Sequence, residues 1–488
     1  MRPSCRRGAA FAARRTGPIA TVRASRSPGP ILRFALTAQS SVIELGRRPV
    51  GRLLLSYALP AIVAMAASSV YNIVDAIFIG HGVGPEAIMG LALTGPLMAL
   101  GAAFGAMVGV GASTLMSMRL GQKDYASAGR ILGNEVLMNL VMGSSLAVVM
   151  ILALEPLLRF FGASDVTLPY ARDFMQVILA GNVVTHLYLG LNAMLRATGR
   201  PRAAMLCTVG TVGLNVVLAP LFIFLLGWGI RGAATATVTA QAAMLAVQLR
   251  MFRRGDGLLR LERKAMRPEM RIVRDALMIG LPQFLINACM CLVTIIVARS
   301  MTRYGGDAAV GAYGIVNRVV MFVVLIVIGI NQGMQPIAGY NYGAGRHDRL
   351  VRLLGITILA ATTVTTVGFL LGTFAAGPLV SLFASDAPEL TALAAWGFRI
   401  AVAAFPLVGL QMVATTFFQS IGHASTSIFL SLSRQLLLLV PLLLILPRIV
   451  APPLHGVWYA MPASDALSAL LAIALLAVQV RRLRRGRK

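Results

Sequence analysis

Long runs of apolar residues, separated by short polar and charged stretches, recur along almost the whole of this sequence. A helix that crosses a bilayer needs about 20 predominantly apolar residues. Twelve runs approach or exceed that length: residues 53–79, 88–118, 131–154, 173–195, 203–226, 232–250, 275–298, 309–340, 353–375, 391–419, 426–447 and 456–480. The pattern predicts an all-α integral membrane protein with twelve transmembrane helices.

The composition supports this prediction. Of the 488 residues, 57% are hydrophobic and only 12% are charged, whereas about a quarter of an average soluble domain is charged. This composition excludes an ordinary cytosolic enzyme. The formal net charge of +27 raises the question of nucleic acid, but in so apolar a chain arginines more often set the orientation in a bilayer. We therefore expect this protein to interact with a lipid bilayer and not with nucleic acid.

The loops between the predicted helices differ in charge. One alternating set of loops, which includes both ends of the helical region and the central segment 251–274, holds 27 Lys and Arg residues. The opposite set holds six. Because Lys and Arg are retained on the cytoplasmic side during insertion, the count predicts a multi-pass protein with both termini in the cytoplasm. We expect the membrane to be a bacterial inner membrane.

The two ends of the chain are strongly basic. Residues 1–44 form an extension that we expect to be disordered, with eight Arg and no acidic residue in its first 43 positions. Its composition is typical of an organellar transit peptide, and an upstream extension without a role is the alternative. Residues 481–488 form a second basic segment, which we expect to be a cytoplasmic tail.

An internal repeat divides the chain. Leu59-Pro60 and Leu281-Pro282 are 222 positions apart, and the same offset relates the loop residues 121–133 to residues 343–355. The repeat predicts two six-helix lobes, 45–250 and 275–480, joined by the cytoplasmic linker 251–274. Two parallel repeats of this kind enclose a cavity between them, and rocking of one against the other gives alternating access.

Short motifs in the helical region resemble those of the multidrug and toxic compound extrusion (MATE) family. They occur in the family's order and cover about residues 45–480: Tyr71-Asn-Ile-Val-Asp75-Ala-Ile-Phe-Ile-Gly80, Gly111-Ala-Ser-Thr114, Leu120-Gly-Gln122, Leu195-Arg-Ala-Thr-Gly199, Leu214-Asn215, Pro220-Leu-Phe-Ile-Phe224, Gly232-Ala-Ala-Thr235, Gly333-Met-Gln-Pro336 and Tyr340-Asn-Tyr-Gly-Ala344. The resemblance implies a twelve-helix antiporter that expels organic cations and other amphipathic drugs in exchange for protons or sodium ions.

One position departs from the family's pattern. Many bacterial and archaeal members carry an Asn on the fifth helix and an Asp four residues later, facing an acidic residue of the first helix. Here Asn215 is present, but Ala219 occupies the position of the second carboxylate. The resemblance therefore implies an ion-coupling site that contains Asp75 and Asn215, with the choice between H⁺ and Na⁺ left open.

Asp75 is also the leading candidate without the resemblance. An ionisable residue within a transmembrane helix is costly and is a functional hypothesis by default. Asn72 lies three residues earlier and is expected on the same helix face. A structural carboxylate that is hydrogen-bonded to its helix neighbours near the membrane interface is the alternative.

Four charged residues of the second lobe fall at similar depths. Asp465, Arg318, Arg399 and Arg434 each lie about eight to thirteen residues inside their helices, which corresponds to roughly 12–20 Å. We expect them to meet in a buried network. That network is either a structural set of ion pairs or a substrate site.

Polar residues without charge are candidates for the cavity wall. Gln283, Asn287 and Gln335 either line the substrate cavity or bridge neighbouring helices. Glu135, near the start of the third helix, is expected to complement the helix dipole, with a transport role as the alternative. His186 is expected to pack against the cavity wall or within the lobe.

Three classes of function can be compared on these residues. The first is a cation-coupled multidrug antiporter, active as a monomer and needing no cofactor besides H⁺ or Na⁺. The second is a flippase for a lipid-linked or other anionic substrate, because Arg318, Arg399 and Arg434 suit a pyrophosphate. The third is a membrane enzyme. The sequence argues against this last class, because it has no Walker motif and its four Cys and five His have no metal-ligand spacing.

Overall fold

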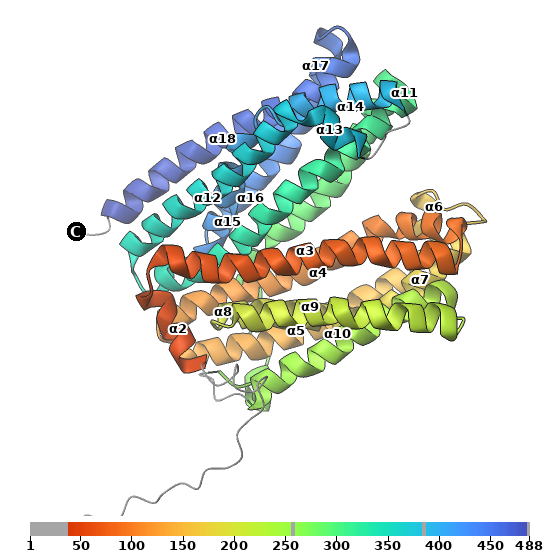
Figure 1. Cartoon of the computed structure of the whole chain (residues 1–488). Helices are drawn as coiled ribbons and strands as arrows, with labels where there is room; N and C mark the ends of the chain where they lie inside the picture. Colours follow the sequence, from red (N-terminus) through yellow and green to blue (C-terminus); the bar gives the residue numbers. More distant parts are fainter. Residues whose placement is uncertain (1–37, 255–258, 383–386, 486–488) are drawn as a thin grey trace, which may run out of the picture.

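The computed structural model describes residues 38–254, 259–382 and 387–485, and all regular structure in this part of the chain is helical (Figure 1). The first repeat contains α2 (Ala38–Arg47), α3 (Val50–Gly82), α4 (Pro85–Gly121), α5 (Tyr125–Leu152), α6 (Leu154–Phe160), α7 (Leu168–Ala180), α8 (Asn182–Ala197), α9 (Pro201–Pro220), the π-helical η1 (Leu221–Leu225) and α10 (Gly229–Arg254).

The short 3₁₀ helix η2 (Arg263–Met266) precedes the second repeat. That repeat contains α11 (Met270–Gly343), α12 (His347–Phe374), α13 (Ala376–Ser381), α14 (Pro388–Ala401), α15 (Phe405–Ser420), α16 (Ala424–Leu432), the π-helical η3 (Ser433–Leu439), α17 (Val440–Ile449) and α18 (Pro453–Arg485).

The predicted all-α membrane fold is confirmed, and the helices in the described part of the chain agree with the twelve predicted spans. Eight helical segments are long and apolar enough to cross a membrane, and the bent pairs α7–α8 and α14–α15 bring the number to ten. Within α11, Gly306 has a left-handed φ of 63°, so that this element is two helices joined at a kink. The 26-residue α10 packs against α7, α8 and α9 and completes the twelve.

The expected disordered extension lies mostly outside the described residues, which begin at residue 38. Its last seven residues, 38–44, differ from the expectation, because they belong to α2. Val42 and Leu45 of this helix are buried in the cores of the two different lobes. Parts of the linker, 255–258, and of the tail, 486–488, also lie outside the described residues.

The buried apolar residues show where the two lobes meet. Two hydrophobic clusters belong to one lobe each and occupy the end of the molecule that carries α6, α13 and Gly306, here called the open end. The other two clusters are shared. Ile272, Ala276 and Ile279 of α11 pack into the first lobe, and Val50, Leu53 and Tyr57 of α3 pack into the second. The lobes therefore exchange helices at the opposite end, here called the closed end, and diverge toward the open end (Figure 1).

Polar contacts between the lobes reinforce the closed end. Asn341 Nδ2 donates to the Leu45 carbonyl at 3.2 Å, and Arg349 Nη2 donates to the Arg48 carbonyl at 2.6 Å. The linker also packs here, since Asn134 Nδ2 donates to the Arg267 carbonyl at 3.1 Å. The same end carries the loops that are rich in Lys and Arg.

Candidate functional site

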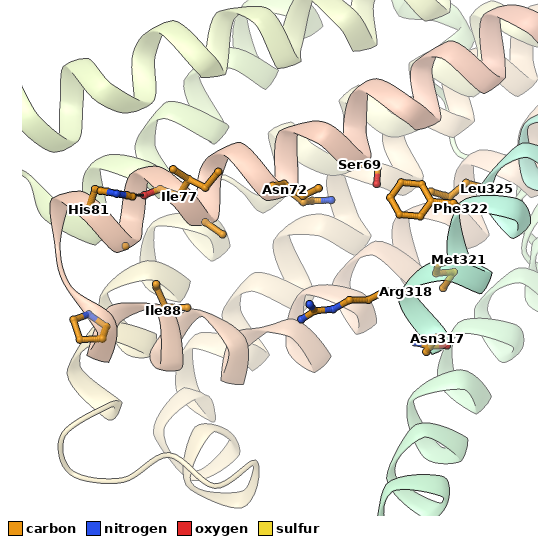
Figure 2. Close-up of a pocket in the computed structure, with 14 residues that line it drawn as sticks. Ser69, Asn72, Ile77, His81, Ile88, Asn317, Arg318, Met321, Phe322 and Leu325 are labelled. Carbon is orange, nitrogen blue, oxygen red and sulfur yellow. Dashed lines mark hydrogen bonds between the residues drawn. The ribbon is translucent and has the colours of Figure 1, made fainter. Parts of the chain in front are cut away.

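A cleft of about 1020 Å³ separates the lobes toward the open end. Its walls come from α3 and α4 on one side and from the second helix of α11 on the other. Figure 2 shows Asn72 on α3 and Arg318 extending from α11 across the space toward the α3–α4 wall. Most of the remaining lining is apolar, with Ile77, Ile88 and Phe322 among the side chains.

A second cavity of about 500 Å³ adjoins this cleft at greater depth, and Asn317 and Met321 line both. Four residues predicted to line the substrate cavity are in its wall: Gln283, Asn287, Gln335 and Arg434. Nine amide side chains contribute in total: Gln283, Asn287, Asn317, Asn331, Gln332, Gln335, Gln411, Gln419 and Gln435. The deep cavity thus offers many neutral donors and acceptors between apolar and methionine surfaces.

Two of these amides also bridge neighbouring helices. Gln335 Nε2 donates to the Thr114 hydroxyl of the first lobe at 3.2 Å, and Gln419 Nε2 of α15 donates to the Ile279 carbonyl of α11, within the second lobe, at 3.1 Å. The two interpretations of the cavity amides, lining and helix bridging, therefore both apply to Gln335.

The charge of the two spaces is positive. Arg196 and Arg434 line the deep cavity and Arg318 lines the cleft, while the described lining residues include no Asp or Glu. Arg434 Nε lies 2.7 Å from Asp465 Oδ1, and this carboxylate is buried behind the wall. Arg196 is bonded to the amide oxygen of Asn192 rather than to a carboxylate.

The expected four-residue network is wrong in part. The structure brings Arg434 and Asp465 together, but neither Arg318 nor Arg399 forms an ion pair with Asp465 among the described residues. Arg318 belongs to the cleft, and Arg399 is exposed on α14 and lines neither space. Depth along a helix places residues at one level of the membrane, but it does not determine which face of the helix carries them.

A separate polar site lies inside the first lobe, around Asp75. Asp75 is 7% exposed, and no residue in the described part of the chain forms a hydrogen bond with its Oδ1 atom. Tyr71, one turn earlier on the same face of α3, shares a 2.8 Å hydrogen bond with the Thr237 hydroxyl of α10. Asn215 Nδ2 of α9 donates to the same hydroxyl at 3.1 Å. Three helices therefore hold a small hydrogen-bonded set beside a buried carboxyl group.

The structure separates Asn72 from this site. Asn72 is exposed in the cleft, whereas Asp75 points into the lobe. Ala219, the position where the family's second carboxylate was expected, is fully buried in the apolar core of the same lobe. Tyr71 and Thr237 were missed by sequence reasoning. The four-residue spacing to Asp75 was an available signal for Tyr71, but no spacing signal connects Thr237 with Asp75.

The sequence of this chain matches a known family of proteins. The MatE family profile matches residues 60–221 and 282–445, one segment in each lobe. The chain belongs to the MatE family. Because this is a family of membrane transporters, the chain is a multi-pass membrane transporter and not an enzyme. The match in two segments also agrees with the internal repeat of the MatE fold seen here.

Relatives and solved structures extend the MatE assignment over the helical region. The chain is 26% identical over 420 residues to the multidrug export protein MepA of Staphylococcus haemolyticus (strain JCSC1435), covering 86% of this chain and 92% of that protein. The MepA protein of Staphylococcus aureus (strain N315) is 25% identical over 431 residues, covering 88% of this chain and 94% of the relative. A MATE family transporter solved in an outward-facing conformation superposes with a TM-score of 0.86 at 24% identity, covering 91% of this chain and 99% of that one. This likeness supports the fold.

Proposed function

We propose that this MatE protein is a secondary multidrug efflux antiporter. It exports amphipathic compounds, including organic cations, in exchange for H⁺ or Na⁺ by alternating access. The observation that carries the proposal is a buried carboxyl site in one lobe beside a cavity that is closed at one end and open at the other. The relatives named multidrug export proteins support the same substrate class.

The orientation follows from charge. The loops that hold most of the Lys and Arg residues gather at the closed end, so this end faces the cytoplasm of a bacterial inner membrane. The described conformation is then outward-open. Both termini lie on the cytoplasmic side, and the chain acts as a monomer with no cofactor other than the coupling ion.

Asp75 carries the coupling ion in this proposal. A buried carboxylate without a cationic partner is unfavourable in the membrane, and binding of a proton or Na⁺ removes its charge. Its α3 also forms one wall of the cleft, where Asn72 lines the space. A change of charge at Asp75 therefore acts on a helix that contacts both the lobe interior and the substrate path.

The deep cavity binds the substrate. Its amides form hydrogen bonds with varied polar groups, and Met290, Met321 and Met412 add adaptable apolar contacts. Rocking of the lobes about the helices exchanged at the closed end would expose this cavity to the cytoplasm.

Transport into inside-out vesicles tests this function. We expect the wild type to take up an amphipathic dye when the vesicle lumen is acidic or rich in Na⁺, and we expect Asp75→Asn to reduce the uptake to background. Asp165→Asn is the matched control, because Asp165 is an exposed carboxylate near the open end, paired with Arg159 at 3.1 Å, and its loss should leave uptake unchanged. Full gradient-driven uptake by Asp75→Asn would show that Asp75 is not the coupling residue.

The positive lining favours a second candidate, a flippase for an anionic lipid-linked substrate. Arg196, Arg318 and Arg434 suit phosphate groups, whereas no described lining carboxylate attracts a cation. The same vesicles distinguish the candidates when they are offered a short-chain lipid pyrophosphate. Uptake of that compound without uptake of any dye would replace the antiporter proposal with this one.

A further inference from the structure

A second buried polar cluster lies in the first lobe, between α4, α5 and α8. Its members are Glu135 and Asn139 of α5 and His186 of α8, each with no exposed surface. Glu135 is ten residues beyond the start of α5 at Tyr125, so it lies too far inside to act on the helix dipole, which falls off within the first turn. The expectation that Glu135 complements the dipole of this helix is therefore wrong.

The cluster is tightly built. Asn139 Nδ2 donates to Glu135 Oε1 at 2.5 Å. Opposite them on α8 stands Gly190, where an added Cβ would lie 1.8 Å from Glu135 Oε1 and 2.3 Å from Asn139 Nδ2. One turn farther along α5, Gly143 packs against α8, where an added Cβ would lie 3.0 Å from the Val183 Cα and 3.5 Å from the His186 Cβ. Helix α8 thus has a glycine at the point where Glu135 and Asn139 need space, and α5 and α8 remain close one turn farther along.

Two buried oxygen atoms of the cluster lack a hydrogen-bond donor among the described residues. Glu135 Oε2 and Asn139 Oδ1 are both buried acceptors without a donor. The ring nitrogens of His186 also make no well-formed hydrogen bond, although the Gly101 carbonyl lies close. Two unpartnered acceptors around one carboxyl group are unusual in a protein interior, where most buried polar atoms are paired.

Charged residues on the neighbouring elements do not supply the missing partner. The arginines of the three helices themselves are bonded elsewhere, Arg119 to Gln122, Arg130 to Glu269 and Arg196 to Asn192. In the described part of the chain no charged group on the surrounding elements forms an ion pair or hydrogen bond with Glu135 or His186; these groups are Glu155, Arg159, Arg172, Asp173, Arg202, Arg231, Arg250, Arg253, Lys264, Arg271, Arg274 and Asp275.

Two glycines of α4 lie between the cluster and the deep cavity. Gly105 and Gly109 of α4 line that cavity. On their far side, an added Cβ at Gly105 would lie 3.4 Å from His186 Cδ2, and one at Gly109 would lie 3.2 Å from the Gly190 Cα. Gly105 therefore lies between His186 and the cavity. Glu135 lies farther from the cavity, behind Gly109 and Gly190.

We propose that Glu135, supported by Asn139, is a second proton-binding site of the first lobe, and that His186 passes protons between it and the deep cavity. The role in coupling rests on the proposed antiport function. His186 packs beside Gly143, two turns along α5 from Glu135, so a proton from cavity water binds first to a His186 nitrogen and reaches Glu135 Oε2 through intervening water, leaving neutral imidazole and a neutral carboxylic acid. Asp75 is nearer the open end and Glu135 nearer the closed end, so the lobe carries two separate acids although Ala219 lacks a carboxyl group.

Infrared difference spectroscopy on the purified full chain tests the site without requiring transport. Between low and high pH, we expect two buried carboxylic-acid bands to appear and disappear in the wild type. Glu135→Gln should remove one band and keep the other, and Asp75→Asn should do the reverse. Glu155→Gln, at an exposed glutamate paired with Arg159, is the matched control and should keep both bands.

Proton release on binding of tetraphenylphosphonium gives the second readout. We expect the number of protons released per bound cation to fall by about half in Glu135→Gln. Asp75→Asn, as a separate single variant, should lower it by about the same amount. His186→Gln should leave the number unchanged and slow the release. If Glu135→Gln does not fold, Glu135→Asp provides the test, because it should shift the band rather than remove it.

The proposal is overturned if the bands of Glu135→Gln match those of the wild type at every pH, or if the Glu135 band responds to NaCl and not to pH. These results are independent of the proposed transport. A Glu135 band that titrates in a protein that moves no dye under any gradient would leave the proton site standing and remove the antiport function.

Discussion

The hydroxyl of Thr237 joins three helices at the site around Asp75. It contacts the Tyr71 hydroxyl at 2.8 Å, accepts from Asn215 at 3.1 Å and donates to the Ala233 carbonyl at 3.2 Å. A small hydroxyl therefore fixes the side chains that surround the carboxyl group of Asp75, and the site depends on a residue that carries no charge.

Replacing Thr237 by Val keeps the shape of the side chain and removes these bonds. Because two buried polar groups lose their partner, we expect a loss of about 1–3 kcal/mol of stability and a clear loss of gradient-driven transport. The control is Thr185→Val, which breaks a 2.6 Å bond to Gln241 in the same lobe. Thermal unfolding should change alike in both variants and vesicle transport only in Thr237→Val. Equal transport losses would argue against a specific role of Thr237.

For single residues, the sequence points to the charged candidates but does not show which side chains surround them. Asp75 and Asn215 could be predicted, the one from its cost in a membrane and the other from the MATE resemblance. Thr237 could not, because Thr is common in apolar helices and the contact crosses between helices. Arg399 was misplaced for the related reason that a linear sequence gives its depth but not its neighbours.

Helix contacts at the closed end depend on glycine in repeat-related positions. An added Cβ at Gly280 would lie 1.8 Å from the Met107 carbonyl oxygen, and one at Gly111 would lie 1.9 Å from that of Ala276. In the other half of the interface, Gly333 and Gly329 of α11 approach the backbone of α3 in the same way, at Ala58 and Ile62. Gly111 and Gly333 are separated by 222 positions, the offset of the repeat.

We expect Gly280→Ala to destabilise the protein by about 1–3 kcal/mol, because the neighbouring atom belongs to rigid backbone. Gly355→Ala on α12 is the control, since nothing lies within 4 Å of an added Cβ there, and alanine should be neutral or slightly stabilising. Thermal unfolding in detergent measures both. A melting temperature for Gly280→Ala equal to that of the wild type would contradict the close packing of α4 and α11.

Element boundaries were largely predictable. The charged residues around Arg346 mark the start of one apolar run, and the span predicted at 353–375 corresponds to α12 at His347–Phe374. The bends were not predictable from apolar runs, because the chain remains apolar through the 57° break between α7 and α8. Helix α2 was missed as well, since its burial depends on both lobes.

The whole molecule combines a shared closed end with two separate cores at the open end. The cleft and deep cavity lie between the lobes, and in the proposed cycle the lobes move about the helices that they exchange. The repeat predicted the two lobes and the cavity, but the sequence could not predict which conformation would be adopted, because one sequence must adopt both conformations in an alternating-access transporter. The excess of basic charge in alternate loops remains the basis for the predicted orientation.

The most direct test of the antiport account measures both fluxes at once in proteoliposomes that contain the purified chain. When a pH or Na⁺ gradient is imposed, we predict that an amphipathic dye moves against its own gradient while the cation moves in the opposite direction, and that both movements stop in Asp75→Asn. A dye that only equilibrates across the membrane, with no opposing movement of H⁺ or Na⁺, would contradict the account.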